Sequence, residues 1–76
     1  MAHFYKKIGI RIRQLRLKKK YTQEEMAVLL GVDVNLFAEF EDGKKRIFVD
    51  CISKMAQIYG VTIDEIVFGV TDQGKN

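Results

Sequence analysis

The chain has 76 residues, of which 47% are hydrophobic and 30% charged, with no Pro, one Cys and one His. This length holds one small domain that buries only about 60% of the surface of its unfolded chain, so we expect no separate domain for a small-molecule effector. A single Cys and a single His exclude an internal disulfide and a zinc site, and no apolar run approaches the roughly 18 residues of a membrane span.

Charge is distributed unevenly along the chain. Residues 1–20 carry eight Lys and Arg and no acid, whereas the remaining residues carry five Lys and Arg against ten acids. A basic segment is typical of a protein with a polyanionic partner, but it is equally typical of a solvated helix, so charge alone leaves both open. The first residues lack the apolar stretch of a signal peptide, and we expect a cytoplasmic protein that needs no cofactor and spans no membrane.

The first expected element is an amphipathic helix over residues 5–19. Its apolar residues recur every three or four positions, as one stripe along the helix. The stripe consists of Tyr5, Ile8, Ile12 and Leu15. Ile10 and Leu17 fall on the opposite side, and we interpret them as ordinary surface rather than as a minor contact patch.

A second, short helix begins after Thr22. Thr22 and Glu25 have the spacing of a capping box, in which each side chain accepts a hydrogen bond from the backbone N–H of the other residue. Gly31 ends this helix, because a residue without Cβ adopts the left-handed conformation at low cost. The inner face of the helix consists of Met26, Ala27 and Leu30.

A third helix follows almost at once, with Asp33 as its N-cap and Gly43 after its last turn. Phe37, Phe40 and Glu41 fall on one side of this helix, and Asn35, Ala38, Glu39 and Asp42 fall on the other. The loop that follows places three cations in succession on an exposed connection. These cations are Lys44, Lys45 and Arg46.

Two further helices complete an all-α fold of five helices. The fourth ends at Gly60 and is expected to bury Val49, Ile52, Met55, Ala56 and Tyr59, with Cys51 half-buried at the flank of this stripe. Phe48 cannot cap this helix with its side chain, so its ring either packs on the core or is exposed for a partner. Thr62 and Glu65 repeat the capping-box spacing and open a short fifth helix with Ile63, Ile66 and Val67. We expect a domain over residues 1–69 and a flexible polar tail over residues 70–76.

The second and third helices have the spacing of a helix-turn-helix unit, with Gly31, Val32 and Asp33 as the turn. A generic helical hairpin would use the same turn, so the turn alone does not establish DNA binding. Further segments fall in register with a known pattern. They are Ile12-Arg13-Gln14-Leu15-Arg16, Tyr21-Thr22-Gln23-Glu24-Glu25-Met26-Ala27, Leu30-Gly31-Val32, Phe37, Phe40-Glu41-Asp42-Gly43-Lys44 and Gly60-Val61. On these segments the chain resembles the lambda repressor/Cro (XRE) family of helix-turn-helix regulators over residues 8–69.

The resemblance implies a role for individual residues. It implies an ion pair between Arg16 and Glu41 that holds the third helix in place. It implies contacts to DNA phosphates at Lys20, Thr22, Gln23, Lys44, Lys45 and Arg46. It implies base reading at Asp33, Val34, Asn35, Leu36, Ala38 and Glu39. For Gln23 and the cationic loop, a plain helix former and a solvated charge run remain the alternatives.

The third helix departs from the family at its outward positions. Relatives commonly carry Ser, Arg, Thr or Gln there, whereas this helix offers two acids, Asp33 and Glu39. We interpret Asp33 as an N-cap rather than a base contact. Glu39 can accept a hydrogen bond from cytosine N4, Asn35 can hold adenine through N6 and N7, and an apolar neighbour, Val34 or Leu36, can contact a thymine methyl.

Two functions follow from these observations. The first is a transcriptional regulator, a repressor by operator occupancy, that binds double-stranded DNA as a homodimer, with its dimer surface at Ile66, Val67 and Phe68. The second is a protein-interaction module on the same fold, such as an anti-repressor or an antitoxin partner, that uses Val34 and Leu36. An enzyme is not expected, because His3 and Cys51 lie far apart in the chain and no phosphate-cradling glycine loop is present.

Overall fold

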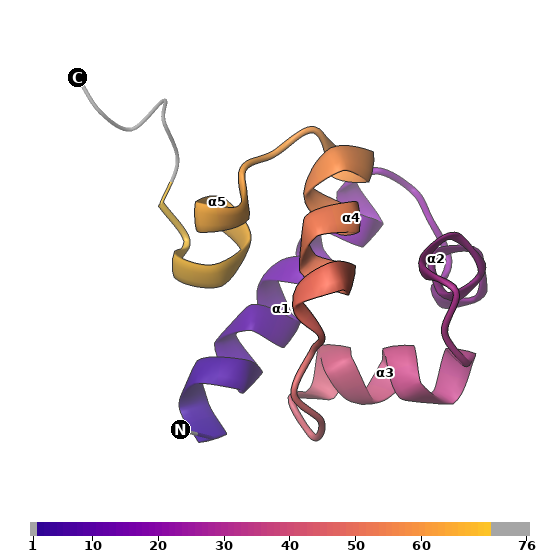
Figure 1. Cartoon of the computed structure of the whole chain (residues 1–76), viewed down its shortest axis with the longest axis horizontal. Helices are drawn as coiled ribbons and strands as arrows, with labels where there is room; N and C mark the ends of the chain where they lie inside the picture. The colour runs from indigo at the N-terminus through magenta and orange to yellow at the C-terminus, as the bar shows by residue number, and fades with distance from the viewer. Residues whose placement is uncertain (1, 71–76) are drawn as a thin grey trace.

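The computed structural model describes residues 2–70. The helices in this range are α1 (Ala2–Lys18), α2 (Gln23–Leu30), α3 (Val34–Asp42), α4 (Val49–Tyr59) and α5 (Ile63–Phe68). No strand occurs within residues 2–70, so the described fold is all-α with five helices, as the sequence predicts. In Figure 1, α2 and α3 lie on one side of α1 and α4, and α5 lies on the other. None of these helices combines the length and the apolar character that a bilayer crossing requires.

The helix ends follow from local chemistry. At the start of α2, Thr22 Oγ1 accepts from the Glu25 N–H at 3.0 Å and Glu25 Oε1 accepts from the Thr22 N–H at 2.9 Å, so the expected capping box is complete. At the start of α5 only half of the second box is present among the described residues, where Thr62 Oγ1 accepts from the Glu65 N–H at 3.0 Å.

The first helix begins three residues earlier than periodicity predicts, at Ala2. Two aromatic contacts accompany this first turn, one of them to α5. The ring of Phe4 packs edge-on against Tyr5, with centroids 5.1 Å apart, and lies 6.4 Å from the ring of Phe68 at the end of α5. These contacts support a first turn that its own sequence pattern does not mark.

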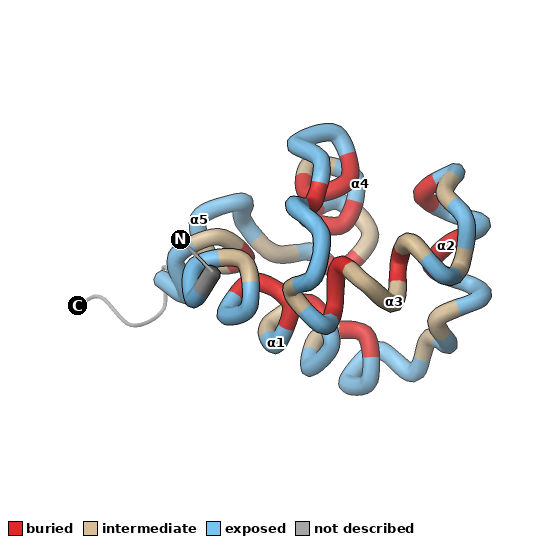
Figure 2. Tube along the Cα trace, turned by 90° about the horizontal axis from the view of Figure 1, so that it is seen from below, coloured by how far each residue is buried: buried red, intermediate tan, exposed pale blue. Residues whose placement is uncertain are grey.

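All five helices contribute to the core, and Figure 2 shows buried positions recurring along them. Its largest fully buried side chains are Tyr59, Phe37, Phe40, Ile8, Ile12, Met26, Met55 and Ile66. The expected burial of Val49 is wrong: its side chain is 77% exposed. Val49 is the first residue of α4 and faces away from the core, and Cys51, in the same turn, is buried instead.

Phe48, at the N-cap of α4, both packs on the core and remains partly exposed, which are the two alternatives that the sequence leaves open. Its ring packs edge-on against the buried ring of Phe40, with centroids 5.3 Å apart, while 52% of the residue stays exposed. It makes no side-chain hydrogen bond to cap α4. Ile47 beside it is buried, so the end of the loop before α4 is held by apolar contacts rather than by a polar cap.

Gly9 permits the close approach of α1 and α3. A Cβ built on Gly9 would lie 2.3 Å from the carbonyl oxygen of Glu41 and 2.6 Å from that of Phe40. Both obstacles are backbone atoms, so a larger residue could be accommodated only by moving α3 away from α1. The tail expected over residues 70–76 lies outside the described residues, except for Val70.

Candidate nucleic-acid interface

The turn between α2 and α3 is built from backbone hydrogen bonds and one side-chain cap. Gly31 adopts φ 72° and ψ 33°, and its N–H donates to the carbonyl of Val28 at 3.2 Å. The N–H of Val32 donates to the carbonyl of Ala27 at 3.0 Å, and Asp33 Oδ2 accepts from the Asn35 N–H at 2.9 Å. These bonds close α2, open α3 and fix the angle between the two helices.

A buried polar network ties α3 to α1 and α2. Arg16 Nε donates to Glu41 Oε2 at 2.6 Å, and Arg16 Nη2 donates to Glu41 Oε1 at 3.2 Å. Gln23 Nε2 donates to the same Oε1 at 2.9 Å, and Arg16 Nη1 donates to the carbonyl of Tyr21 at 2.9 Å. The hydrogen bond to Glu41 raises the pKa of Arg16 above its usual value. The ion pair implied by the resemblance is therefore present, and it includes Gln23.

The outward face of α3 is short and acidic. Asn35 is exposed in the first turn of α3, and Asp33 and Asp42 are exposed at the two ends of the helix. Ala38 and Glu39 share this side of α3 and are half-buried. Two apolar residues at the edge of this face, Val34 and Leu36, are partly buried because they pack against the core. They are therefore less accessible to a ligand than their positions in the sequence suggest.

Exposed cations lie on the two segments that flank the α2–α3 unit. Lys44, Lys45 and Arg46 are all exposed in the loop after it, and the guanidinium of Arg46 lies 5.9 Å from the ring centroid of Tyr5. On the other side, Lys20 is exposed before α2 and adopts φ 67°, the one positive φ among the described residues that are not glycine. A surface hollow brings Lys20 together with the start of α2, and its lining includes Thr22 and Gln23.

The surface expected for dimer formation needs a correction. Ile66 has no exposed surface and belongs to the core, so it cannot contact a second molecule. Val67 is half-buried, and Phe68 is 62% exposed. Phe4 lies beside Phe68 and is 37% exposed, so the exposed apolar surface here comes from both α1 and α5.

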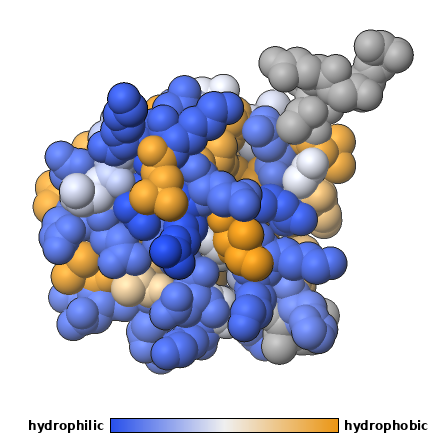
Figure 3. All heavy atoms as spheres, turned by 180° about the vertical axis from the view of Figure 1, so that it is seen from behind, coloured by the Kyte–Doolittle hydropathy of each residue, from blue (hydrophilic) through white to orange (hydrophobic). Residues whose placement is uncertain are grey.

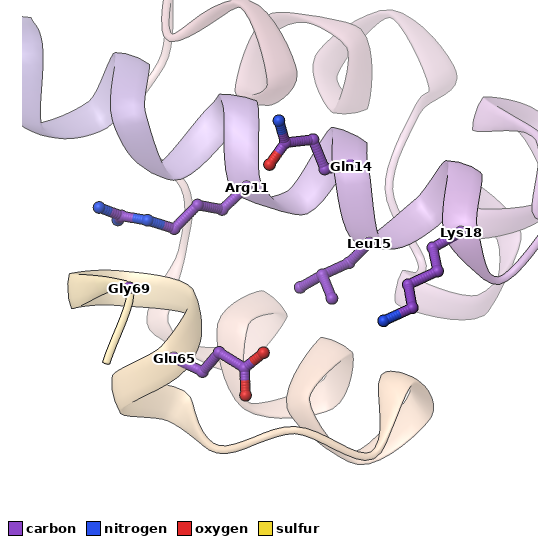
Figure 4. Close-up of a pocket in the computed structure, with 6 residues that line it drawn as sticks. All are labelled: Arg11, Gln14, Leu15, Lys18, Glu65 and Gly69. Carbon is purple, nitrogen blue, oxygen red and sulfur yellow. The ribbon is translucent and has the colours of Figure 1, made fainter. Parts of the chain in front are cut away.

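Arg11 holds the end of α5 against α1, a contact that the sequence does not indicate. Its Nη1 donates to the carbonyl of Val67 at 2.8 Å and to that of Ile66 at 3.2 Å. Figure 4 shows Arg11 reaching from α1 toward the end of α5 at Gly69, above a hollow that Leu15, Lys18 and Glu65 also line. A cation at the C-terminus of a helix satisfies carbonyls that lack helical partners.

Comparisons with known proteins agree with this geometry. A family model described as a helix-turn-helix domain matches residues 7–67. The chain is 37% identical over 57 residues to the cryptic phage CTXphi transcriptional repressor RstR of Vibrio cholerae, which is 75% of this chain and 51% of RstR. It is 36% identical over 58 residues to the uncharacterized HTH-type transcriptional regulator YazB of Bacillus subtilis, which is 76% of this chain and 84% of YazB. The chain thus spans about half the length of RstR and most of YazB.

One solved structure supports the same assignment. The restriction-modification controller protein C.AhdI from Aeromonas hydrophila matches with a TM-score of 0.75 and 30% sequence identity, covering 87% of this chain and 98% of C.AhdI. The fold, the family model and the relatives agree with the resemblance seen in the sequence, and the relatives are named as regulators rather than as enzymes. This chain belongs to the helix-turn-helix family of transcriptional regulators of the lambda repressor/Cro type.

Proposed function

We propose that the chain binds a DNA operator as a homodimer and represses transcription by occupying that site. The observation that carries the proposal is how α3 is held: the Arg16–Glu41–Gln23 network ties it to α1 and α2 and leaves Asn35 exposed. Exposed cations precede α2 and follow α3 in the chain. The name of RstR, a transcriptional repressor, supports repression over activation. We assign the protein to the cytoplasm, because the bacterial relatives named above are regulators of transcription.

Phosphate contacts are assigned to the ends of the unit. Lys44, Lys45 and Arg46 approach the backbone after α3, and Lys20 approaches it before α2. The first turn of α2 presents the backbone N–H of Gln23 and the positive end of the helix dipole. The N–H of Thr22 already donates to Glu25, so we assign the Thr22 contact to its hydroxyl group. Because the Gln23 side chain is held by Glu41, its contact to phosphate uses the backbone N–H rather than the amide group.

Base reading is assigned to the outward face of α3. Asn35 is the best-placed residue, because it is exposed and its amide matches the N6 and N7 edge of adenine. Glu39 accepts from cytosine N4, and Ala38 leaves room for the groove floor. Asp33 is occupied as the N-cap of α3. Val34 and Leu36 pack against the core, so we assign them to positioning and limit their DNA contact to thymine methyl groups at the margin.

The dimer surface is assigned to Val67 and Phe68 of α5 together with Phe4 of α1. Phe4 and Phe68 form an exposed aromatic pair, and one domain of this size reads too few base pairs to be specific alone. Phe68→Asp should convert a dimer to a monomer in sedimentation velocity. Val28→Asp is the matched control, because Val28 is 80% exposed on α2, away from α5.

Selection from a random duplex pool, followed by fluorescence anisotropy on the enriched sequences, tests the function. We expect a two-fold symmetric site, and Asn35→Ala should weaken binding by about 1–3 kcal/mol and relax the preference at one position of each half-site. Gln57→Ala, an exposed change on α4, is the control and should leave affinity unchanged. Binding without enrichment of any sequence would contradict the operator assignment.

A protein-interaction module is the second candidate, and one observation favours it. Residues 21–43 contain six acids and no Lys or Arg, and α2 exposes Val28 and Leu29 beside Glu24 and Glu25. A surface of this kind repels phosphate and suits a basic protein partner. If no duplex binds even at low salt, this second function replaces the first.

A further inference from the structure

The helix-turn-helix unit of this chain, residues 21–43, has no cationic side chain of its own. The six acids among residues 21–43 face no cation from the same segment. The cations that attract the backbone must therefore come from the flanking segments. In α1, Arg16 is bound to Glu41 and Arg11 is bound to α5, so both are committed to the fold.

One outer face of α1 carries cations that have no such role. Lys6 and Arg13 are seven residues apart, two turns or about 10.5 Å along the helix, and therefore lie on nearly the same side of it. Lys20 continues the same spacing just beyond the end of α1. All three are exposed, and neither Lys6 nor Arg13 forms a side-chain ion pair with another described residue. We call Lys6, Arg13 and Lys20 the α1 cationic strip.

Two surface hollows join this strip to the phosphate-contact segments proposed above. The first is lined by Lys6, Ile10, Arg13, Gln14, Leu17, Glu41, Asp42 and Lys44. The second is lined by Arg13, Arg16, Leu17, Lys20, Tyr21, Thr22, Gln23 and Glu24. Because they share Arg13 and Leu17, the strip runs without a break from the loop after α3 to the start of α2.

We infer that Lys6 and Arg13 bind phosphates of the DNA strand that passes between the loop after α3 and the start of α2. This inference rests on the proposed function and deepens it, because it extends the contacted backbone along α1. Arg13 lies between the two segments, and its guanidinium suits a phosphate through paired donors. Lys6 adds a cation next to Lys44.

The other groups on this surface are compatible with a DNA backbone. Glu41 is neutralised by Arg16 at 2.6 Å, which leaves Asp42 and Glu24 as the acids of the two hollows without a bound cation among the described residues. Ile10 and Leu17 are 48% and 55% exposed between the cations, where the apolar part of the sugars can cover them. Figure 3, the side opposite to that of Figure 1, shows isolated hydrophobic groups within a hydrophilic surface.

The salt dependence of binding tests this inference without knowledge of the operator. The probe is a fluorescein-labelled 30-base-pair duplex of mixed sequence, titrated by anisotropy across a salt series. The affinity K falls as salt rises, and each phosphate contact makes the slope of log K against log salt concentration steeper by about 0.9. Arg13→Gln and Lys6→Gln should therefore each reduce the magnitude of this slope by about 0.9. Lys18→Gln is the matched control, because Lys18 is exposed on the side of α1 that faces α5.

The outcomes separate the inference from the function on which it rests. A lower slope for Arg13→Gln and Lys6→Gln with an unchanged slope for Lys18→Gln supports the strip. A slope that falls equally in all three variants reports net charge alone and overturns the inference. Wild-type binding whose slope is unaffected by Arg13→Gln overturns it as well and leaves the proposed function standing. No binding of the wild-type chain to any duplex would overturn both. Thermal melts of each variant confirm that the fold is intact.

Discussion

Arg16 and Glu41 face each other through a two-pronged contact, with Nε 2.6 Å from Oε2 and side chains that are only 9% and 2% exposed. Glu41→Ala would leave the guanidinium buried without its partner and Gln23 without its acceptor. We expect a loss of about 3–5 kcal/mol in the free energy of unfolding, seen as a large drop in Tm. Glu24→Ala, an exposed acid on α2, is the control. A Glu41→Ala melt close to wild type would mean that the pair does not hold α3.

The contact between α1 and α3 depends on Gly9. Gly9→Ala places a Cβ against two backbone carbonyls and should destabilise the fold by about 3 kcal/mol or more, the upper range for overpacking. Gly31→Ala provides a comparison in which the loss of stability has a different physical cause. No atom lies within 4 Å of its added Cβ, but φ is +72°, so we expect a cost of about 1–2 kcal/mol from the left-handed backbone alone. Denaturant titrations measure both, and equal costs would contradict the steric account.

Tyr59 links stability to alkaline pH. Its hydroxyl is buried and has no hydrogen-bond partner among the described residues, and burial raises the pKa of the phenol well above its usual value. The unfolded chain therefore loses this proton first, near pH 10, so stability falls as pH rises above about 10. Tyr59→Phe should remove that part of the alkaline loss and, at neutral pH, leave stability unchanged or raise it by up to about 1 kcal/mol. Urea titrations between pH 7 and 11 measure both effects, and a variant that tracks wild type throughout would refute the coupling.

Cys51 should report unfolding rather than redox state. Its thiol is 3% exposed, and burial raises its pKa, so little thiolate meets a reagent in the folded chain. Reaction with a disulfide reagent at pH 8 should be slow in buffer and fast in denaturant. Rapid, complete labelling of the native protein would disagree with this placement. Cys51→Ala should leave DNA affinity unchanged, since α4 carries none of the proposed contacts.

The sequence predicts those parts of the fold that local chemistry determines. Thr22, Gly31, Asp33 and Gly43 each end or begin a helix where their backbone and side-chain preferences place them. The ion pair between the first and third helices could be predicted only from the family resemblance, because the pattern of residues along the chain does not show that residues 16 and 41 lie together.

Contacts between distant segments explain what the sequence does not predict. Arg11 binds carbonyls 55 and 56 residues away, and Gly9 matters only because α3 crosses it. Periodicity identifies Val49 and Ile66 as apolar but does not show where the core ends. The structure exposes Val49 and buries Ile66, which reverses the expected role of each. The residues of the proposed DNA surface are predicted in part. Periodicity predicts which face of a helix they occupy, but it does not predict which residues from other helices lie beside them.

Arg11 affects the geometry that a dimer of this chain would present to an operator. A helix of six residues is too short to be stable alone, and α5 is held by its buried Ile66 together with the Arg11 side chain that α1 extends to its carbonyls. If α5 joins two copies of the chain, the separation and rotational phase of their two recognition helices depend on that junction. Arg11, which lies outside every proposed contact with DNA, would then help to set the length of the spacer between half-sites.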